Sequence, residues 1–209
     1  MSSIIFGYQL REMKIASDLT RDSIKISDSA LRISRETFIA AQRPWVSIEM
    51  NLLGPLNFDP NGAEIEIGVK LKNHGHSPAM NARNFVIFDP SPAAKKGPDF
   101  CRDQRGRDLS NFAQVIFPDD VILDTHLARS DNSELKSAAS RNGIIFPYIT
   151  ACVDYISGLD NSRHQSELTA NLVRTPKSPS DSFAITINDG NVPEDSLHLE
   201  IIFGARRAD

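Results

Sequence analysis

The chain has 209 residues, and its length allows one well-cored domain with an appendage. A hydrophobic share of 40% and a charged share of 24% are ordinary for a soluble globular protein. The net charge of −4 argues against a nucleic-acid-binding protein, which usually carries a basic face. We therefore expect no nucleic-acid partner.

The beginning of the chain predicts no targeting or membrane-spanning segment. It has no basic region, and its first apolar run covers only Ile4–Phe6. No stretch approaches the ~20 apolar residues of a membrane helix. The chain as written is expected to be cytoplasmic, with membrane attachment only if an upstream segment precedes it.

Residues 8–42 contain neither glycine nor proline, which predicts one long helix within a first domain, residues 1–43. One stripe recurs every seven residues, namely Leu10, Ser17, Ile24, Leu31, Phe38 and Trp45. A second stripe on nearly the opposite side, across charged residues, contains Ile15, Leu19, Ile26, Ile33 and Ala40. A surface helix needs only one apolar stripe, so the pattern favours self-association through residues 8–42, as a coiled coil or a larger bundle. The alternative is a helix folded back along its own domain.

Arg43-Pro44 ends the helix, because proline and the residue before it both resist the helical conformation. Within residues 44–209 the clearest pattern is Ala63–Asp89, where apolar and polar residues alternate on both sides of a turn-forming segment, Asn73–Pro78. These two strands are expected to pair.

Further strands are predicted at Ile144–Ile156 and Arg163–Thr175, and a final hairpin is predicted from Ser182–Asn188 and Ser196–Gly204. About eight short strands separated by turn residues are typical of a sandwich. The predicted fold class is mainly β, an immunoglobulin-like antiparallel β-sandwich preceded by one long N-terminal α-helix. A jelly-roll or a small barrel is the alternative.

Four sequence stretches resemble a family of uncharacterised, chiefly proteobacterial, proteins. They are Gln9–Met13, Ala40–Val46, Leu71–Ala79 and Ala151–Tyr155, the last followed by Gly158. The resemblance implies a helical spacer after a membrane anchor, and then a β-sandwich with an Asn-x-Gly-x-x-Pro-Ala turn. It implies no catalytic residue and no cofactor.

Two histidines, His74 and His76, could in principle hold zinc together with two further donors. They lie in a turn, and no cysteine or histidine stands at a ligand-like spacing from them, so no metal site is expected. Sequence motifs for nucleophilic catalysis and phosphate binding are also absent. The sequence therefore predicts neither catalytic, cofactor-binding nor metal-binding residues.

Two cysteines, Cys101 and Cys152, are too few for a disulfide framework. Two unconnected thiols are the favoured interpretation, and one bridge in an exported protein is the alternative. The segment with Lys95, Lys96 and Arg102–Arg107 is the first choice for a partner surface, since loops on sandwiches often bind.

The absence of a catalytic constellation leads to a functional prediction of a non-enzymatic interaction or assembly module. Its helical arm would oligomerise or dock, and its sandwich would bind another macromolecule, most simply a protein. The alternative is an accessory domain of a membrane-tethered protein, with residues 8–42 as a spacer. A carbohydrate-binding or enzymatic sandwich is least favoured, because one Trp and three Tyr provide few aromatic side chains.

Overall fold

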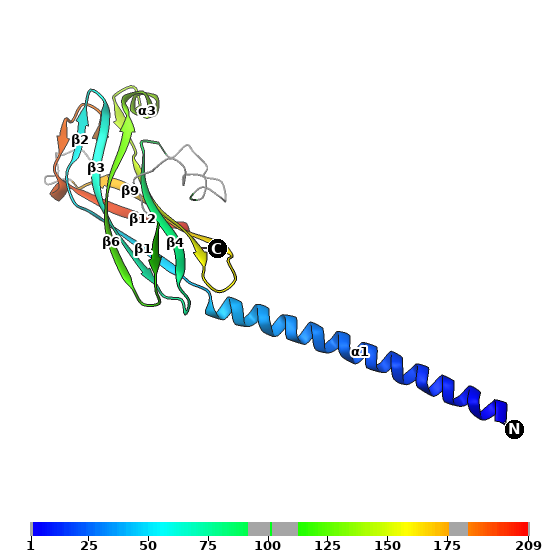
Figure 1. Cartoon of the computed structure of the whole chain (residues 1–209). Coiled ribbons are helices and arrows are strands. Elements are labelled where there is room, and N and C mark those ends of the chain that lie inside the picture. Colours follow the sequence, from blue (N-terminus) through cyan, green and yellow to red (C-terminus); the bar gives the residue numbers. More distant parts are fainter. Residues whose placement is uncertain (1, 92–100, 102–112, 176–183, 209) are drawn as a thin grey trace. The chain divides into compact units, whose positions relative to one another are not determined.

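The computed structural model divides the chain into two compact units, residues 1–42 and residues 43–209 (Figure 1). The structure describes residues 2–91, 101, 113–175 and 184–208, with side chains described for residues 11–91, 101, 113–175 and 184–202.

The first unit is a single helix, α1 (Ser2–Gln42). It confirms the predicted long helix and begins six residues before the predicted segment. It ends just before Arg43 and Pro44, where the proline ring cannot continue the hydrogen-bond ladder. Trp45 therefore lies outside the helix, and it does not extend the first apolar stripe as the sequence interpretation had it.

The second unit is a sandwich of two antiparallel sheets, which confirms the predicted mainly β fold with an N-terminal helix (Figure 1). The first sheet contains β1 (Val46–Leu52), β2 (Leu56–Asp59), β3 (Gly62–Asn73), β6 (Val121–Asp131) and β11 (Asn191–Val192). The second sheet contains β4 (Ala79–Asp89), β5 (Gln114–Ile116), β8 (Tyr148–Ser157), β9 (Arg163–Arg174) and β12 (Leu197–Ala208), in the order β12-β9-β8-β4-β5.

Four small elements complete the described part of the sandwich unit. β7 (Ile144–Ile145) pairs with β10 (Ile185–Thr186), α3 (Asn132–Ala138) follows β6, and the short 3-10 helix η2 (Glu194–Ser196) precedes β12. In the first sheet β3 is central, with β6 along one side and both β1 and β2 along the other.

The core lies between the sheets and is built by strict alternation. Ile65, Ile67 and Val69 on β3 are at most 2% exposed. Ile149, Ala151 and Val153 on β8 face them from the other sheet and are completely buried. Side chains at alternate positions of a strand share one face, so the period of two that marks the sequence becomes this core.

The two strands of Ala63–Asp89 do not pair, which corrects the sequence prediction. β3 belongs to the first sheet, and β4 pairs with β8 and β5 in the second. The turn Asn73–Pro78 therefore carries the chain from one sheet to the other. The predicted final hairpin is also wrong, because β10 pairs with β7 while β12 pairs with β9.

A buried asparagine, Asn73, organises this crossing between the sheets. Its Oδ1 accepts hydrogen bonds from the backbone N–H groups of Trp45 (3.1 Å) and Gly75 (2.9 Å). Its Nδ2 donates to the carbonyls of Ser77 (2.9 Å) and Ile116 (3.0 Å). All four hydrogen bonds of an amide side chain are satisfied at a completely buried position, so this residue is a structural clamp.

The crossing between the two sheets also explains why several residues occur in the four sequence stretches that resemble the uncharacterised family. A Cβ on Gly75 would lie 2.6 Å from both Pro44 Cα and Trp45 N, so only glycine fits there. The backbone N–H of Gly158 donates to the Pro78 carbonyl (3.1 Å). These motif residues from three separated segments thus meet at one end of the sandwich, where they hold backbone together.

Cys101 and Cys152 form a disulfide, so the favoured interpretation of two unconnected thiols is wrong. Cys152 and Phe85 are register partners on β8 and β4, and with Cys101 they form a second buried cluster. Neighbours of Cys152 along β8 belong to the main core, so this cluster lies on the opposite face of the sheet. The sequence separation of 51 residues left the pairing undetermined.

Candidate functional site

The described side chains of α1 are uniformly exposed. Every residue from Arg11 to Phe38 is exposed, and Met13, Ile26 and Leu31 keep 68%, 70% and 69% of their surface accessible. Most helical stability in proteins comes from packing an apolar face. This helix therefore presents a large exposed apolar surface.

The charged residues of α1 occupy only part of its circumference. At 3.6 residues per turn, all nine charged residues between Met13 and Ala41 lie on three of seven rows that follow the helix. They are Lys14, Asp18, Arg21, Asp22, Lys25, Asp28, Arg32, Arg35 and Glu36. The other four rows span about 160° and form what we name the uncharged face.

Most large side chains of the uncharged face lie in its two outer rows, and most small ones lie in its two inner rows. One outer row contains Ser17, Ile24, Leu31 and Phe38, and the other contains Leu19, Ile26, Ile33 and Ala40. The inner rows contain Met13, Thr20, Ser27, Ser34 and Ala41, and Ala16, Ser23, Ala30 and Thr37. The two apolar stripes are therefore separated by charge on one side of the helix only, which refines the sequence interpretation.

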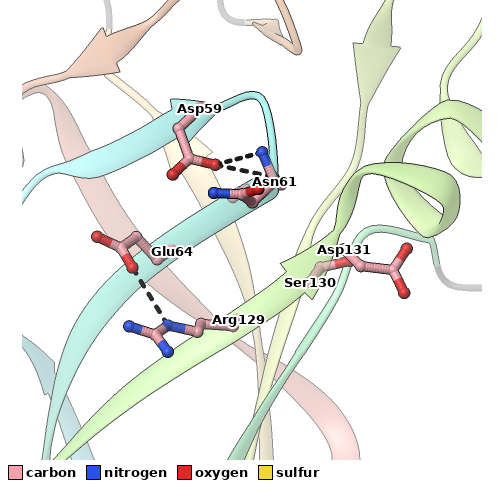
Figure 2. Close-up of a pocket in the computed structure, with 8 residues that line it drawn as sticks. Asp59, Asn61, Glu64, Arg129, Ser130 and Asp131 are labelled. Atoms are coloured by element: carbon pink, nitrogen blue, oxygen red, sulfur yellow. Dashed lines mark hydrogen bonds and ion pairs between the residues drawn. The ribbon is translucent and has the colours of Figure 1, made fainter.

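A pocket of about 320 Å³ opens on the sandwich, where β2, β3, β6 and the start of α3 come together (Figure 2). Three carboxylates and one guanidinium line it. Arg129 Nε donates to Glu64 Oε2 at 3.2 Å across paired strands, and Asp59 Oδ1 accepts from the backbone of Asn61 (2.8 Å) and Gly62 (2.9 Å). Figure 2 shows the carboxylate of Asp131 pointing away from the Glu64–Arg129 pair.

Asp131 is engaged as the N-cap of α3. Its Oδ1 accepts hydrogen bonds from the hydroxyl of Ser133 (2.6 Å) and from the backbone N–H of Ser133 and of Glu134, both at 2.8 Å. The hydrogen bond from the Ser133 hydroxyl, followed by that from Glu134, lowers the pKa of Asp131 below its ordinary value of 3.8. The hydroxyl of Ser130, which also lines the pocket, donates to Glu134 Oε2 (2.8 Å). The polar groups that line the pocket therefore hold turns and strands together.

The two histidines considered for zinc lie in the crossing between β3 and β4. His74 Nε2 lies 3.0 Å from the hydroxyl of Ser47, and the backbone N–H of His74 donates to the Trp45 carbonyl (2.8 Å). Both His74 and His76 are exposed. Among the described residues, no group of three or more His, Cys, Asp or Glu is placed to hold a metal ion.

Two further histidines have structural neighbours. His126 is 8% exposed, and its Nε2 lies 3.0 Å from Asn84 Nδ2 and 3.6 Å from Asp124 Oδ2. The ring of His164 packs beside Tyr155 in the sandwich, with ring centres 5.7 Å apart. Sequence reasoning missed the polar contact between β4 and β6, because the residues are about 40 positions apart.

The segment chosen first as a partner surface lies outside the described residues, apart from Cys101. Lys95, Lys96 and Arg102–Arg107 therefore stay a prediction. The uncharged face of α1 is the surface on which the described structure bears most directly.

Comparison with known proteins adds no identification. No protein family model matches the chain, and no curated protein matches it. In the described part of the chain, no helix has both the length and the apolar composition needed to span a bilayer.

Proposed function

We propose that this protein is a non-enzymatic assembly module, in which α1 joins copies of the chain and each copy presents its sandwich to another protein. The observation that carries the proposal is the uncharged face of α1. Its large side chains are more than half exposed at Leu19, Ile24, Ile26, Leu31, Ile33 and Phe38. Burying a side chain of this kind completely contributes about 1.5–3 kcal/mol, so a shared helix interface is strongly favoured over a solvated helix.

In the described part of the sandwich, the groups that line the pocket have structural roles, which is compatible with the proposal. The lining groups of its pocket are engaged in a cap, a turn and a cross-strand ion pair. A display role needs a stable scaffold and exposed surface, and both are features of sandwich domains.

Two serines on opposite sides of α1 allow a matched test. Ser27 lies in the middle of the uncharged face, and Ser29 lies among the charged rows, where its hydroxyl donates to the Lys25 carbonyl (2.8 Å). Ser27→Asp should dissociate the assembly, because unpaired carboxylates from all copies would converge in an apolar interface. Ser29→Asp places the same residue on the same helix and should leave the assembly intact.

Light scattering of the full chain over a range of concentrations measures both effects. A wild-type chain that stays a monomer up to high concentration contradicts the proposal. Equal masses for the Ser27→Asp and Ser29→Asp variants would place the interface elsewhere.

A second candidate is supported by the disulfide. Disulfides persist in oxidising compartments and are rare in the cytosol, so the Cys101–Cys152 bond favours an extracytoplasmic accessory domain with α1 as its spacer. Rapid alkylation of intact cells followed by mass spectrometry reports the state of the two thiols. Fully alkylated cysteines in the native host would contradict this candidate.

A further inference from the structure

The uncharged face of α1 is wider than a two-stranded coiled coil requires. A two-stranded seam uses two rows per heptad, and this face has four. We name the row of Ile24 and Leu31 together with the inner row of Ser27 seam 1. We name the row of Ile26 and Ile33 together with the inner row of Ala30 seam 2. At about 100° per residue, the two seams point in directions about 110° apart.

This angle sets the number of helices that can close around one axis. Each helix in a ring contacts two neighbours, and the angle between the contacts is about 60° for three helices, about 90° for four and about 120° for six. Seams about 110° apart therefore fit a ring of roughly four to six helices. In such a ring seam 1 of one copy packs on seam 2 of the next.

The charged rows that border the two seams carry opposite charge. The row beside seam 1 contains Lys14, Arg21 and Arg35, with Asp28 as its one acidic member. The row beside seam 2 contains Asp22 and Glu36, with Ile15 and Ser29 as its uncharged members. We name them the basic row and the acidic row. Arg21 is adjacent to Asp22 and Arg35 to Glu36, so each pair differs by only about 1.5 Å in height along the helix.

Contacts within the helix leave these charges available to a neighbour. Asp22 has an ion pair with Lys25 at 3.4 Å and Glu36 has one with Arg32 at 3.8 Å, and all four side chains are at least 64% exposed. Exposed ion pairs of this kind contribute little. Within the described chain, Arg21 and Arg35 have no ion-pair partner.

We infer that copies of this chain assemble through α1 as a parallel, in-register ring in which the basic row of each helix lies against the acidic row of the next; this rests on the assembly proposed above. The parallel register brings Arg21 beside Asp22 and Arg35 beside Glu36 at every interface. The interface joins two different sides of the helix, so it closes into a ring instead of stopping at a dimer.

Charge exchange within the full chain tests the ring. The first variant makes the basic row acidic (Arg21→Glu with Arg35→Glu), and the second makes the acidic row basic (Asp22→Arg with Glu36→Arg). The third combines all four substitutions, which retains the net charge and exchanges the two rows. Native mass spectrometry and sedimentation at low ionic strength measure the mass of each.

The wild-type chain should form assemblies of about four to six copies. The first and second variants should each need about tenfold or more higher concentration to assemble, because like charges then meet at every interface. The third variant should assemble like the wild type, since the rows are complementary again. An equimolar mixture of the first two should form rings with equal numbers of each and an even total.

The outcomes separate the ring from the assembly role. A wild-type dimer, an oligomer unaffected by the first two variants, or a third variant that stays dissociated would overturn the ring while leaving self-assembly standing. A wild-type monomer would overturn both. If the uncharged face instead binds a different protein, the third variant should weaken that binding. In the ring, the same variant keeps self-assembly intact.

Discussion

The two units of this protein differ in how far they bury the same residue type. Ile67 on β3 is completely buried and Ile65 is 1% exposed, whereas Ile26 and Ile33 on α1 are 70% and 58% exposed. The sandwich covers its isoleucines with its own second sheet. The helix is a single element with no second layer of its own. The sandwich is therefore sufficient for its own stability, and the helix depends on something outside itself.

Removing the disulfide is expected to have the largest effect on the stability of the sandwich. Replacing Cys101→Ala together with Cys152→Ala should lower the free energy of unfolding by about 4 kcal/mol, because the bond closes a loop between residues 51 positions apart. Urea denaturation followed by fluorescence of Trp45 measures this change. Reduction of the wild-type protein should give the same shift, and an unchanged midpoint in both experiments would contradict the prediction.

An isoleucine in each unit tests the comparison directly. Ile67→Ala should destabilise the sandwich by about 3 kcal/mol through lost burial and a residual cavity. Ile26→Ala should leave the unfolding of the sandwich unchanged and should weaken only the assembly. Denaturation curves and mass in solution, recorded on both variants, separate the two effects. A destabilised sandwich in Ile26→Ala would show that the units are coupled.

The asparagine clamp is expected to have a smaller effect. Asn73→Ala should cost about 2 kcal/mol, because it leaves the N–H groups of Trp45 and Gly75 and two carbonyls without their partners. Asn51 on β1 is exposed, and its side chain donates to the neighbouring Leu52 carbonyl. Asn51→Ala is therefore the control, and equal stability of the two variants would rule out the clamp.

The cap of α3 gives the smallest expected effect, and it depends on pH. Hydrogen bonds lower the pKa of Asp131 in the folded protein, so its charged form stabilises the fold above the ordinary carboxyl pKa of 3.8. This stabilisation is lost as the pH falls through the lowered pKa.

A pair of cap variants isolates the titration. Asp131→Ala should be less stable than wild type at pH 7, with the difference shrinking below about pH 4. Asp131→Asn retains the accepting oxygen without titrating. Thermal unfolding between pH 7 and pH 2 measures both, and a difference for Asp131→Ala that does not change with pH would contradict the titration.

Local sequence patterns predicted the positions of the helix and the strands better than they predicted which strands pair. The repeat of Ile24, Leu31 and Phe38 was enough to predict the helix, because helical periodicity is a local property. The alternation around Ile65 and Ile67 predicted a strand for the same reason. The segment Asn73–Pro78 signals a turn, but hairpins and crossings between sheets use the same turn residues, so the sequence could not choose between them.

The two candidate surfaces differ in the same respect, since one follows from local sequence and the other depends on strand pairing. The uncharged face of α1 can be derived from the sequence, since its rows follow from residue spacing alone. The pocket could not be predicted, because pairing of β3 with β6 brings Glu64 beside Arg129, which is 65 positions away. The disulfide was missed because no local pattern specifies that Cys101 meets Cys152 on the outer face of a sheet.

The junction at Trp45 and Val46 also has a mechanical consequence. The Trp45 N–H is held by Asn73, and the Val46 carbonyl accepts a hydrogen bond from the hydroxyl of Ser166 (2.6 Å) on the other sheet. Val46 N lies 3.5 Å from the hydroxyl of Tyr155, also on that sheet. Tension transmitted along the chain from α1 therefore reaches both sheets at its first point of entry. The junction distributes a pulling force over the whole sandwich instead of unzipping β1 one residue pair at a time.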